Sequence, residues 1–406
     1  MNRNSTTTLP SLAKNRCLTT LIPLLLLLLA TTTARAQTTY YWRGAANASF
    51  TAATSWNTSP TCAGSNRTSA AASDILVFNG GTPVVTMAGQ TIGRPSFINN
   101  TSVALNSASN ATNTILINGD ATDDDLIVES GSSVAITATG TSGSTAGVVL
   151  SLGTSATGKM AGTITLTNAA TNSPDSNSQL KSGAGDALHF KNGGQLIILG
   201  TQTGTALTNT PLFESGSTLE QNAAATSDHT TLATYQPGST FRYIDGAFGG
   251  TATGIDQTSG NLEFAGVNDK TMAGTLNLTI VNNLIMSGND TVTFTIGARG
   301  NGAGATGTLI GGNISVTNPN ATLLFNATGG ASPKAGFNGT TAQTISSTSL
   351  LAFGTNTKLE INNPAGVTLL SDLTISNELL LTNGLLTTTA SGSGLLTMMA
   401  AAPTRP

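Results

Sequence analysis

Residues 358–389 read KLEINNPAGVTLLSDLTISNELLLTNGLLTTT, a series of short apolar runs that each end at Asn, Gly or Asp. Within a run the large residues occupy every second position, as in Leu359 and Ile361. Period two is typical of a β-strand with one buried face. Pairs that favour tight turns, such as Asn383-Gly384, separate the runs. No run is long enough for a helix, so this stretch predicts short strands joined by turns.

The same pattern extends over most of the chain. Expected strands begin at residues 75, 82, 102, 114, 126, 133, 148, 164, 188, 195, 218, 240 and 261. Several follow a shared phrase of Gly, a small polar residue and then the first apolar residue, at Gly131, Gly216, Gly238, Gly260 and Gly274. A recurring turn before a recurring strand is an internal repeat, and its irregular length predicts a solenoid with variable loops. The glycine-rich segment from Gly297 to Gly312 is expected to be a protruding loop.

The first 36 residues have the features of a secretory signal peptide. Basic residues precede an apolar core from Leu18 to Ala30, and Ala34-Arg35-Ala36 places small residues at the two cleavage positions. Cleavage is expected before Gln37. The apolar core is shorter than the about 20 residues of a membrane-spanning helix, and no later segment is apolar enough to cross a bilayer. We therefore expect an extracellular or outer-surface protein without a transmembrane segment after cleavage.

Composition separates the mature chain from an ordinary globular domain. Only 9% of all residues are charged and 4% are aromatic, while glycine alone numbers 46; a typical domain has about 25% charged residues. Of the 16 basic residues, four lie in the first 36, so 12 basic groups accompany 19 acidic ones in the mature chain. Phosphate binding requires clustered Lys and Arg. A nucleic-acid partner is therefore not expected.

Cysteine content excludes an internal disulfide. Cys17 departs with the leader, which leaves Cys62 alone in the mature chain. Stability must then come from packing and backbone hydrogen bonds, although the destination is oxidising. Cys62 is interpreted as an incidental thiol.

Aromatic residues concentrate in residues 37–73, where TTYYWRGAANASFTAATSWNTSP includes both tryptophans, Trp42 and Trp56. A stack of strands leaves an open hydrophobic end, and its terminal unit is atypical because it must cover that end. Residues 37–73 are therefore expected to be an N-terminal cap. The alternative is that the apolar faces of Trp42 and Trp56 form a stacking platform for sugar rings.

The opening YYWRG, the following SW and DILVF, and runs such as GTLNLTIVNNLIM resemble secreted bacterial surface proteins built as right-handed parallel β-helices. These are autotransporter- and adhesin-like repeat proteins, often exported by the type IX system. The resemblance covers most of the mature chain and implies coils with Leu, Ile and Val inward and Thr and Asn outward, in a rod of roughly 70 Å. Type IX proteins end in a sorting domain that this sequence lacks, so we expect either a truncated sequence or a different anchor.

The resemblance and the runs predict an all-β, right-handed parallel β-helix (β-solenoid) at 74–398, after a signal peptide at 1–36 and an aromatic-rich cap at 37–73. Residues 399–406 are expected to form a disordered tail. The alternative fold is a string of β-sandwiches. Such domains usually contain a core Trp or a paired Cys, and the chain after Asn66 contains neither residue type.

Two literal nucleotide-binding motifs do not fit their surroundings. Gly153 to Lys159 nearly spells the phosphate-binding loop, but Met160 stands where a hydroxyl must hold magnesium, and a strand follows instead of a helix. Gly302 to Gly307 matches G-x-G-x-x-G, yet β-type sequence follows it as well. No nucleotide and no other cofactor is therefore expected.

Acidic residues and histidines are the remaining candidates for chemistry. The cluster Asp120, Asp123, Asp124 and Asp125 could supply hard oxygens to calcium, but a solvated turn that blocks strand pairing is the preferred interpretation. His189 lies within the apolar run ALHF and His229 lies next to Asp228, and no G-x-S-x-G nucleophile motif accompanies them. Polysaccharide lyases share the β-helix but use grouped Asp, Lys and Arg, whereas the basic residues here are scattered.

These observations predict a secreted or cell-surface, non-enzymatic β-solenoid that acts as an adhesin-like or structural stalk region. Surface glycans or extracellular matrix are the expected partners. Two alternatives stay open: a glycan-binding module that uses Trp42, Trp56 or a flat Thr/Asn face, and a β-helix enzyme that degrades polysaccharides. No catalytic, cofactor or metal residue is assigned.

Overall fold

The computed structural model describes residues 37–107, 111–119, 124–138, 147–168, 178–199, 207–222, 233–244, 258–267, 270–274, 278–289, 291–296, 307–327, 334–389 and 394–399. All but Gln37 belong to one compact unit, Thr38–Pro406. The expected signal peptide lies outside the described residues, and so do residues 400–406 of the expected tail.

Forty strands and one 3-10 turn, η1 (Ala53–Ser55), make up the regular structure of the described residues. The strands form five sheets, A to E. Neighbouring strands pair in parallel throughout these residues, apart from β1 and β3, which pair antiparallel. After the segment 37–73, each turn of the chain, here called a coil, adds at most one strand to any one sheet. The expected all-β class and parallel β-helix are confirmed.

Sheet B contains 14 strands and extends through the whole described unit. Its members are β2 (Ala48–Ser49), β5 (Val84–Met87), β8 (Ser102–Ser107), β11 (Ser133–Ala138), β14 (Thr163–Asn168), β17 (Gln195–Leu199), β20 (Thr218–Asn222), β22 (Thr240–Tyr243), β24 (Asn261–Phe264), β27 (Leu284–Met286), β30 (Ile314–Val316), β33 (Gln343–Ser347), β36 (Val367–Leu369) and β39 (Leu386–Thr388). With about 4.8 Å between neighbouring strands, this sheet is about 60 Å long.

Sheets A and C form the other two sides of the N-terminal coils. Sheet A consists of β3 (Trp56–Asn57), β1 (Thr39–Trp42), β4 (Ile75–Asn79), β7 (Arg94–Ile98), β10 (Leu126–Val128), β13 (Gly158–Met160), β16 (Leu188–Phe190), β19 (Leu212–Phe213) and β21 (Thr234–Tyr235). Sheet C consists of β6 (Gln90–Ile92), β9 (Thr112–Ile117), β12 (Gly147–Leu152), β15 (Gln179–Lys181) and β18 (Leu207–Thr208).

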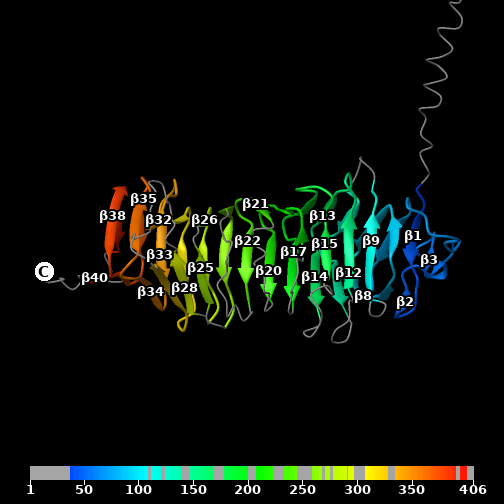
Figure 1. Ribbon diagram of the computed structural model, residues 1–406, viewed down its shortest axis with the longest axis horizontal. Coiled ribbons are helices and arrows are strands. Elements are labelled where there is room, and N and C mark those ends of the chain that lie inside the picture. Colours follow the sequence, from blue (N-terminus) through cyan, green and yellow to red (C-terminus); the bar gives the residue numbers. More distant parts are fainter. Residues whose placement is uncertain are drawn as a thin grey trace, which may run out of the picture. The chain divides into compact units, whose positions relative to one another are not determined.

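Sheets D and E take over these two sides in the C-terminal coils. Sheet D consists of β23 (Thr258–Ser259), β26 (Leu278–Ile280), β29 (Thr308–Ile310), β32 (Lys334–Phe337), β35 (Lys358–Asn362) and β38 (Glu378–Asn383). Sheet E consists of β25 (Lys270–Gly274), β28 (Thr291–Ile296), β31 (Thr322–Ala327), β34 (Leu350–Phe353), β37 (Leu373–Ile375) and β40 (Leu396–Met398). Figure 1 shows the strands following one another in sequence order, from blue β1 to red β38.

Coil length is irregular, as the sequence predicts. Strands β4, β7 and β10 are neighbours in sheet A, yet they begin at Ile75, Arg94 and Leu126. The extra residues lie between strands, because the strands themselves keep their register from coil to coil. Variation in loop length is tolerated because lengthening a loop adds only a small entropic cost.

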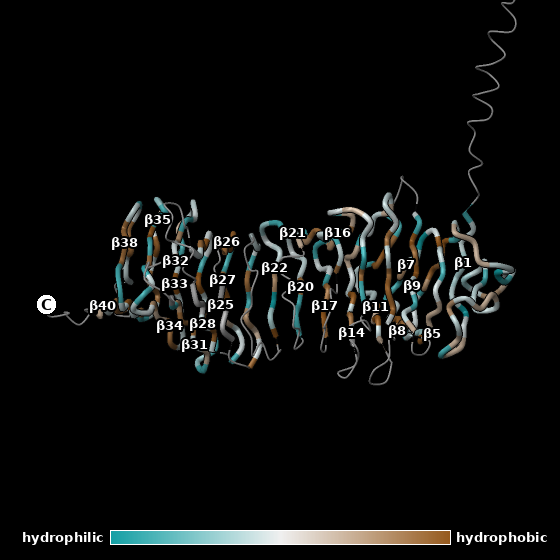
Figure 2. The backbone as a smooth tube through the Cα atoms, viewed as in Figure 1, coloured by the Kyte–Doolittle hydropathy of each residue, from teal (hydrophilic) through white to brown (hydrophobic). Residues whose placement is uncertain are grey.

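Inward side chains form columns in which each residue packs on its counterpart in the next coil. One column in sheet B comprises Val134, Ile164, Leu196, Leu219, Phe241, Leu262, Leu284 and Ile314, all buried. Another stacks the rings of Phe190, Phe213 and Tyr235, with centroids 4.5 and 5.3 Å apart. In Figure 2 hydrophobic and hydrophilic residues alternate along these strands.

The recurring Gly-Ser phrase forms the turn that precedes the sheet B strands β11, β20 and β22. Gly131, Gly216 and Gly238 have φ of 79°, 81° and 86°, which glycine adopts without steric cost. In the turn that contains Gly216, the Ser217 hydroxyl donates to the Glu214 carbonyl at 2.6 Å. The same carbonyl also accepts the Ser217 backbone N–H at 3.0 Å, so Ser217 closes the turn with two hydrogen bonds.

An asparagine ladder replaces the serine turn in the C-terminal coils. The backbone N–H of Asn283 donates to Asn261 Oδ1 at 3.1 Å, and that of Asn313 donates to Asn283 Oδ1 at 2.9 Å. The Thr344 N–H continues the series by donating to Asn313 Oδ1 at 2.7 Å. Each amide thus links two neighbouring coils.

Aromatic packing closes the N-terminal end of the coils. The rings of Trp42 and Trp56 meet edge to face with centroids 5.0 Å apart, and both pack on Phe78 of the first complete coil. Trp56 is fully buried, and its Nε1–H donates to the Phe50 carbonyl at 2.7 Å. These contacts form the expected aromatic-rich cap.

Two local expectations are wrong. Residues 297–306 of the expected Gly297–Gly312 loop lie outside the described residues, but Thr308–Ile310 forms strand β29 between β26 and β32. The glycines on both sides conceal this short alternating segment in the sequence. Gly274 also differs from its expected turn, because it is the last residue of β25.

Candidate functional site

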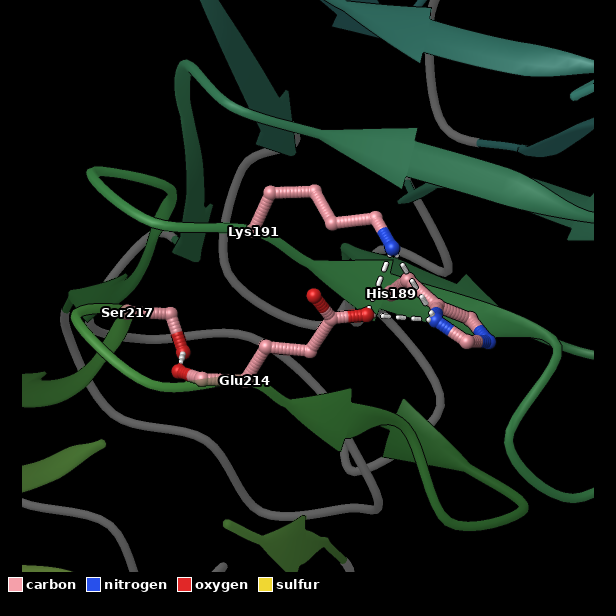
Figure 3. A network of polar contacts seen from close by, with 4 residues as sticks. All are labelled: His189, Lys191, Glu214 and Ser217. Atoms are coloured by element: carbon pink, nitrogen blue, oxygen red, sulfur yellow. Dashed lines mark hydrogen bonds and ion pairs between the residues drawn. The ribbon is translucent and has the colours of Figure 1, made fainter. Parts of the chain in front are cut away.

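Charged side chains on the outer faces gather where strands of adjacent coils place them in register. The first group lies on sheet A and comprises His189, Lys191 and Glu214 (Figure 3). His189 is the outward residue of β16, between the buried Leu188 and Phe190. Its position in the apolar run ALHF is therefore explained by the alternation of the strand.

Glu214 links the two basic side chains. Its Oε1 lies 2.9 Å from His189 Nδ1 and 2.5 Å from Lys191 Nζ. The three side chains are about a quarter to a third exposed. Burial raises the pKa of Glu214, but the hydrogen bonds from Lys191 and His189 and their charges outweigh it. The pKa therefore lies below the ordinary value of 4.5.

Ser217 and His189 are not arranged as a nucleophile and its general base. Ser217 lies close by, but its hydroxyl donates to the Glu214 backbone carbonyl, and Figure 3 shows it directed away from His189. A serine nucleophile would instead need its hydroxyl within hydrogen-bonding distance of the imidazole. The arrangement compensates charge between coils.

A second group lies on sheet B. Arg242 Nε donates to Glu263 Oε2 at 2.8 Å, and Arg242 Nη1 lies 3.6 Å from Glu220 Oε2. These residues occupy the same outward position of three consecutive strands. Ser287 completes the group by donating to Glu263 Oε1 at 2.6 Å. One arginine thus bridges two carboxylates on neighbouring strands.

Sheet D carries a third group. Lys334 Nζ donates to Glu360 Oε1 at 3.1 Å, and the Thr382 hydroxyl donates to the same oxygen at 2.7 Å. Burial raises the pKa of Glu360, but these hydrogen bonds and the charge of Lys334 lower it by more. The pKa of Glu360 therefore lies below the ordinary value of 4.5. Lys358 and Glu378 form a further pair at 2.7 Å on the same sheet.

An uncharged polar column lies beside the second group. It occupies the first outward position of sheet B in seven consecutive strands and comprises Ser102, Ser133, Thr163, Gln195, Thr218, Thr240 and Asn261. The Ser133 hydroxyl donates to Ser102 Oγ at 2.9 Å. This column is the described counterpart of the expected flat Thr/Asn face.

The two tryptophans do not form an exposed platform. Trp56 is fully buried and Trp42 is 7% exposed, so neither ring offers a face on which a sugar could stack in this arrangement. Cys62 is exposed in a turn of the same segment.

The acidic cluster is described only in part. Asp120 and Asp123 lie outside the described residues, and Asp124 is half-buried. Asp125 is buried, and its Oδ2 accepts the Thr157 N–H of the next coil at 3.0 Å. No group of three or more potential metal ligands occurs among the residues that the structure describes. The preferred interpretation, a solvated turn that blocks strand pairing, is wrong for this segment, because Asp125 is buried and the strand Leu126–Val128 that follows pairs with both β7 and β13. The calcium alternative stays untested.

The two literal phosphate-binding motifs continue into strands. The last two residues of the first motif, Gly158 and Lys159, already belong to strand β13 (Gly158–Met160). Of the second motif, residues 302–306 lie outside the described residues, and Gly307 precedes β29. His229 also lies outside them. No described helix is long and apolar enough to cross a membrane.

Sequence reasoning missed the partners of His189 and Arg242. Glu214 follows His189 by 25 residues, Glu263 follows Arg242 by 21, and Glu360 follows Lys334 by 26. Opposite charges separated by about one coil are the signal that could have revealed them.

Comparison with known proteins gives no relative. No protein-family model matches the chain, and neither the curated proteins nor the solved structures contain a significant match.

Proposed function

We propose that this protein is a secreted, non-enzymatic β-helix that serves as an adhesin-like or structural stalk at the cell surface. The observation that carries the proposal is sheet B, whose 14 parallel strands continue through the described unit. A sheet whose strands add along one direction gives reach in proportion to the number of coils. Such reach suits a part that separates a surface from a binding partner.

The outer faces support the same proposal. Lys, Arg and Glu side chains occur in ion-paired groups, as with Arg242 between Glu220 and Glu263. The remaining outward positions of sheet B are mainly Ser, Thr, Asn and Ala. A face with few charges, most of them in ion pairs, stays hydrated through its hydroxyls and amides. The leader at residues 1–36 is the sequence feature that favours secretion.

A glycan-binding role is the second candidate. The observation that favours it is the polar column from Ser102 to Asn261, whose hydroxyls and amides recur at about 4.8 Å intervals. Such groups both donate and accept hydrogen bonds, as sugar hydroxyls do. The partner class is then a neutral polysaccharide.

A single set of assays distinguishes these roles. The purified chain is incubated with neutral and acidic polysaccharides, and both retention and the release of reducing or unsaturated ends are measured. The stalk proposal predicts that the parent chain releases no sugar ends. It also predicts that the His189→Ala and Glu214→Gln variants release none. Release of sugar ends that is lost in these variants would overturn the non-enzymatic proposal.

Retention without cleavage would favour the glycan-binding candidate. Thr218→Val and Thr240→Val in one chain should then reduce retention, because they remove two adjacent hydroxyls while keeping side-chain shape. Thr293→Val on sheet E is the matched control.

A further inference from the structure

The β-helix changes its sheets part-way along the chain. Sheet A ends at β21 and sheet D begins at β23, and no strand pair joins these two sheets among the described residues. Sheets C and E have no described strand pair in common either, because the last strand of sheet C is β18 and the first of sheet E is β25. Sheet B alone continues, through β20, β22 and β24. The boundary between β22 and β24 is here called the junction.

Fewer described backbone ladders cross the junction than join the N-terminal coils. In those coils three strand pairs link one coil to the next, as β10 with β13, β11 with β14 and β12 with β15. Across the junction the described residues show one strand pair, β22 with β24, in which Thr240–Tyr243 faces Asn261–Phe264. In a repeat fold, the interface between neighbouring units decides whether they unfold together. The junction is therefore the place where the coupling between coils is reduced.

The interior is discontinuous at the same place. The column of stacked rings on sheet A ends at Tyr235, whereas the inward column of sheet D begins with the small Ser259. Among the described residues, neither Ser259 Oγ nor the polar atoms of the Gln221 side chain have a hydrogen-bond partner, although both residues are buried. A buried polar group without a partner lowers the stability of the fold around it. Both groups lie within one coil of the junction.

Side chains supply part of the link that the ladders leave out. Arg242 Nε of β22 donates to Glu263 Oε2 of β24 at 2.8 Å, so this ion pair crosses the junction. The rings of Tyr243 and Phe264 stack across it with centroids 5.4 Å apart. A part-exposed ion pair and one ring pair each contribute modestly. They hold the two sides together, but they do not replace two backbone ladders.

We propose that the junction divides the β-helix into two units that unfold separately, residues 38–244 with sheets A, B and C, and residues 258–399 with sheets D, B and E. Within each unit several ladders join neighbouring coils, so the coils of one unit unfold together. The single ladder at the junction lets one unit unfold while the other stays folded. This inference goes beyond the stalk proposal and does not depend on it.

The first test maps unfolding along the whole purified chain. Hydrogen exchange at increasing urea concentration, measured by mass spectrometry of peptides, gives an unfolding midpoint for each segment. We expect one midpoint for peptides from β4 to β22, a different one for peptides from β24 to β37, and a step between them at the junction. A single midpoint along the chain, a gradual change, or a step at another place between β4 and β37 would overturn the proposal.

The second test uses two disulfides at the same outward position of sheet B, in a Cys62→Ser background. Thr165→Cys with Ile197→Cys links two coils of the first unit, and Arg242→Cys with Glu263→Cys links two coils across the junction. Register partners in neighbouring strands lie about 4.8 Å apart, which suits a disulfide. Each variant is measured by the same exchange experiment in its oxidised and reduced forms.

Oxidation of the pair inside the first unit should raise the midpoint of the peptides from β4 to β22 alone. Oxidation of the pair across the junction should bring the two midpoints closer together, because that link constrains the chain as soon as either unit unfolds. The pair inside the first unit is the matched control for the pair across the junction. A control disulfide that raises both midpoints equally, or a junction disulfide that leaves their separation unchanged, would contradict the division into two units.

Discussion

At the scale of single residues, the asparagine ladder makes the clearest contribution. Asn283 accepts a hydrogen bond from the backbone of Asn313, and its own backbone N–H is bonded to Asn261. Asn283→Ala leaves the Asn313 N–H without that acceptor, and we expect a loss of about 1–3 kcal/mol in the free energy of unfolding. Urea denaturation of both proteins measures it.

Asn320→Ala is the control for this substitution, because Asn320 is exposed in a turn. It should change the free energy of unfolding by no more than about 0.5 kcal/mol. An equal effect of the two substitutions would show that the ladder adds nothing beyond an ordinary surface asparagine.

The Glu214 carboxylate should make stability depend on pH. Its pKa in the folded protein lies below the ordinary 4.5, so the ionised form stabilises the fold above that pH. This contribution is lost as pH falls through the lowered pKa. Glu214→Gln should therefore lower the melting temperature at pH 7, and the difference from the parent should shrink toward pH 3. A difference that stays constant over this range would contradict the assignment.

The alternation of inward and outward side chains along a strand could be predicted from the sequence. The side-chain contacts between neighbouring coils could not. The run ALHF identifies His189 as part of a strand, yet its partner Glu214 depends on the length of the intervening coil. Coil lengths vary through loops that carry no periodic signal. The sequence predicts a cap for the segment of Trp42 and Trp56 but leaves the sugar platform open as an alternative, because aromatic content alone does not determine which ring faces are covered.

At the scale of elements, the stacked aromatic column should carry a large share of local stability. Phe213 of β19 is fully buried between the rings of Phe190 and Tyr235. Phe213→Ala removes both contacts and leaves a cavity, and we expect a loss of about 3–5 kcal/mol. Guanidinium denaturation measures the loss, with Val267→Ala as an exposed control. A loss below about 1 kcal/mol would mean that the coils collapse onto the cavity.

Strands were more predictable than their assembly into sheets. The apolar runs at 75, 133 and 195 are strands β4, β11 and β17. The sequence does not show where sheets A and C end and sheets D and E begin. The strands on every side of the β-helix have the same period of two, so the period does not reveal to which sheet a strand belongs. The sequence prediction places strand β29 inside the expected Gly297–Gly312 loop, although β-type sequence follows Gly307, because glycines on both sides of its three residues dominate the local pattern.

At the scale of the whole molecule, the central claim is that this β-helix acts as a stalk outside the cell. Its most direct test is protease treatment of intact source cells, followed by immunoblotting of surface, medium and cytoplasmic fractions. The stalk account predicts protein in the surface or medium fraction, with the surface-bound form digested while the cells stay intact. Protein confined to the cytoplasmic fraction and protected until the cells are lysed would contradict it.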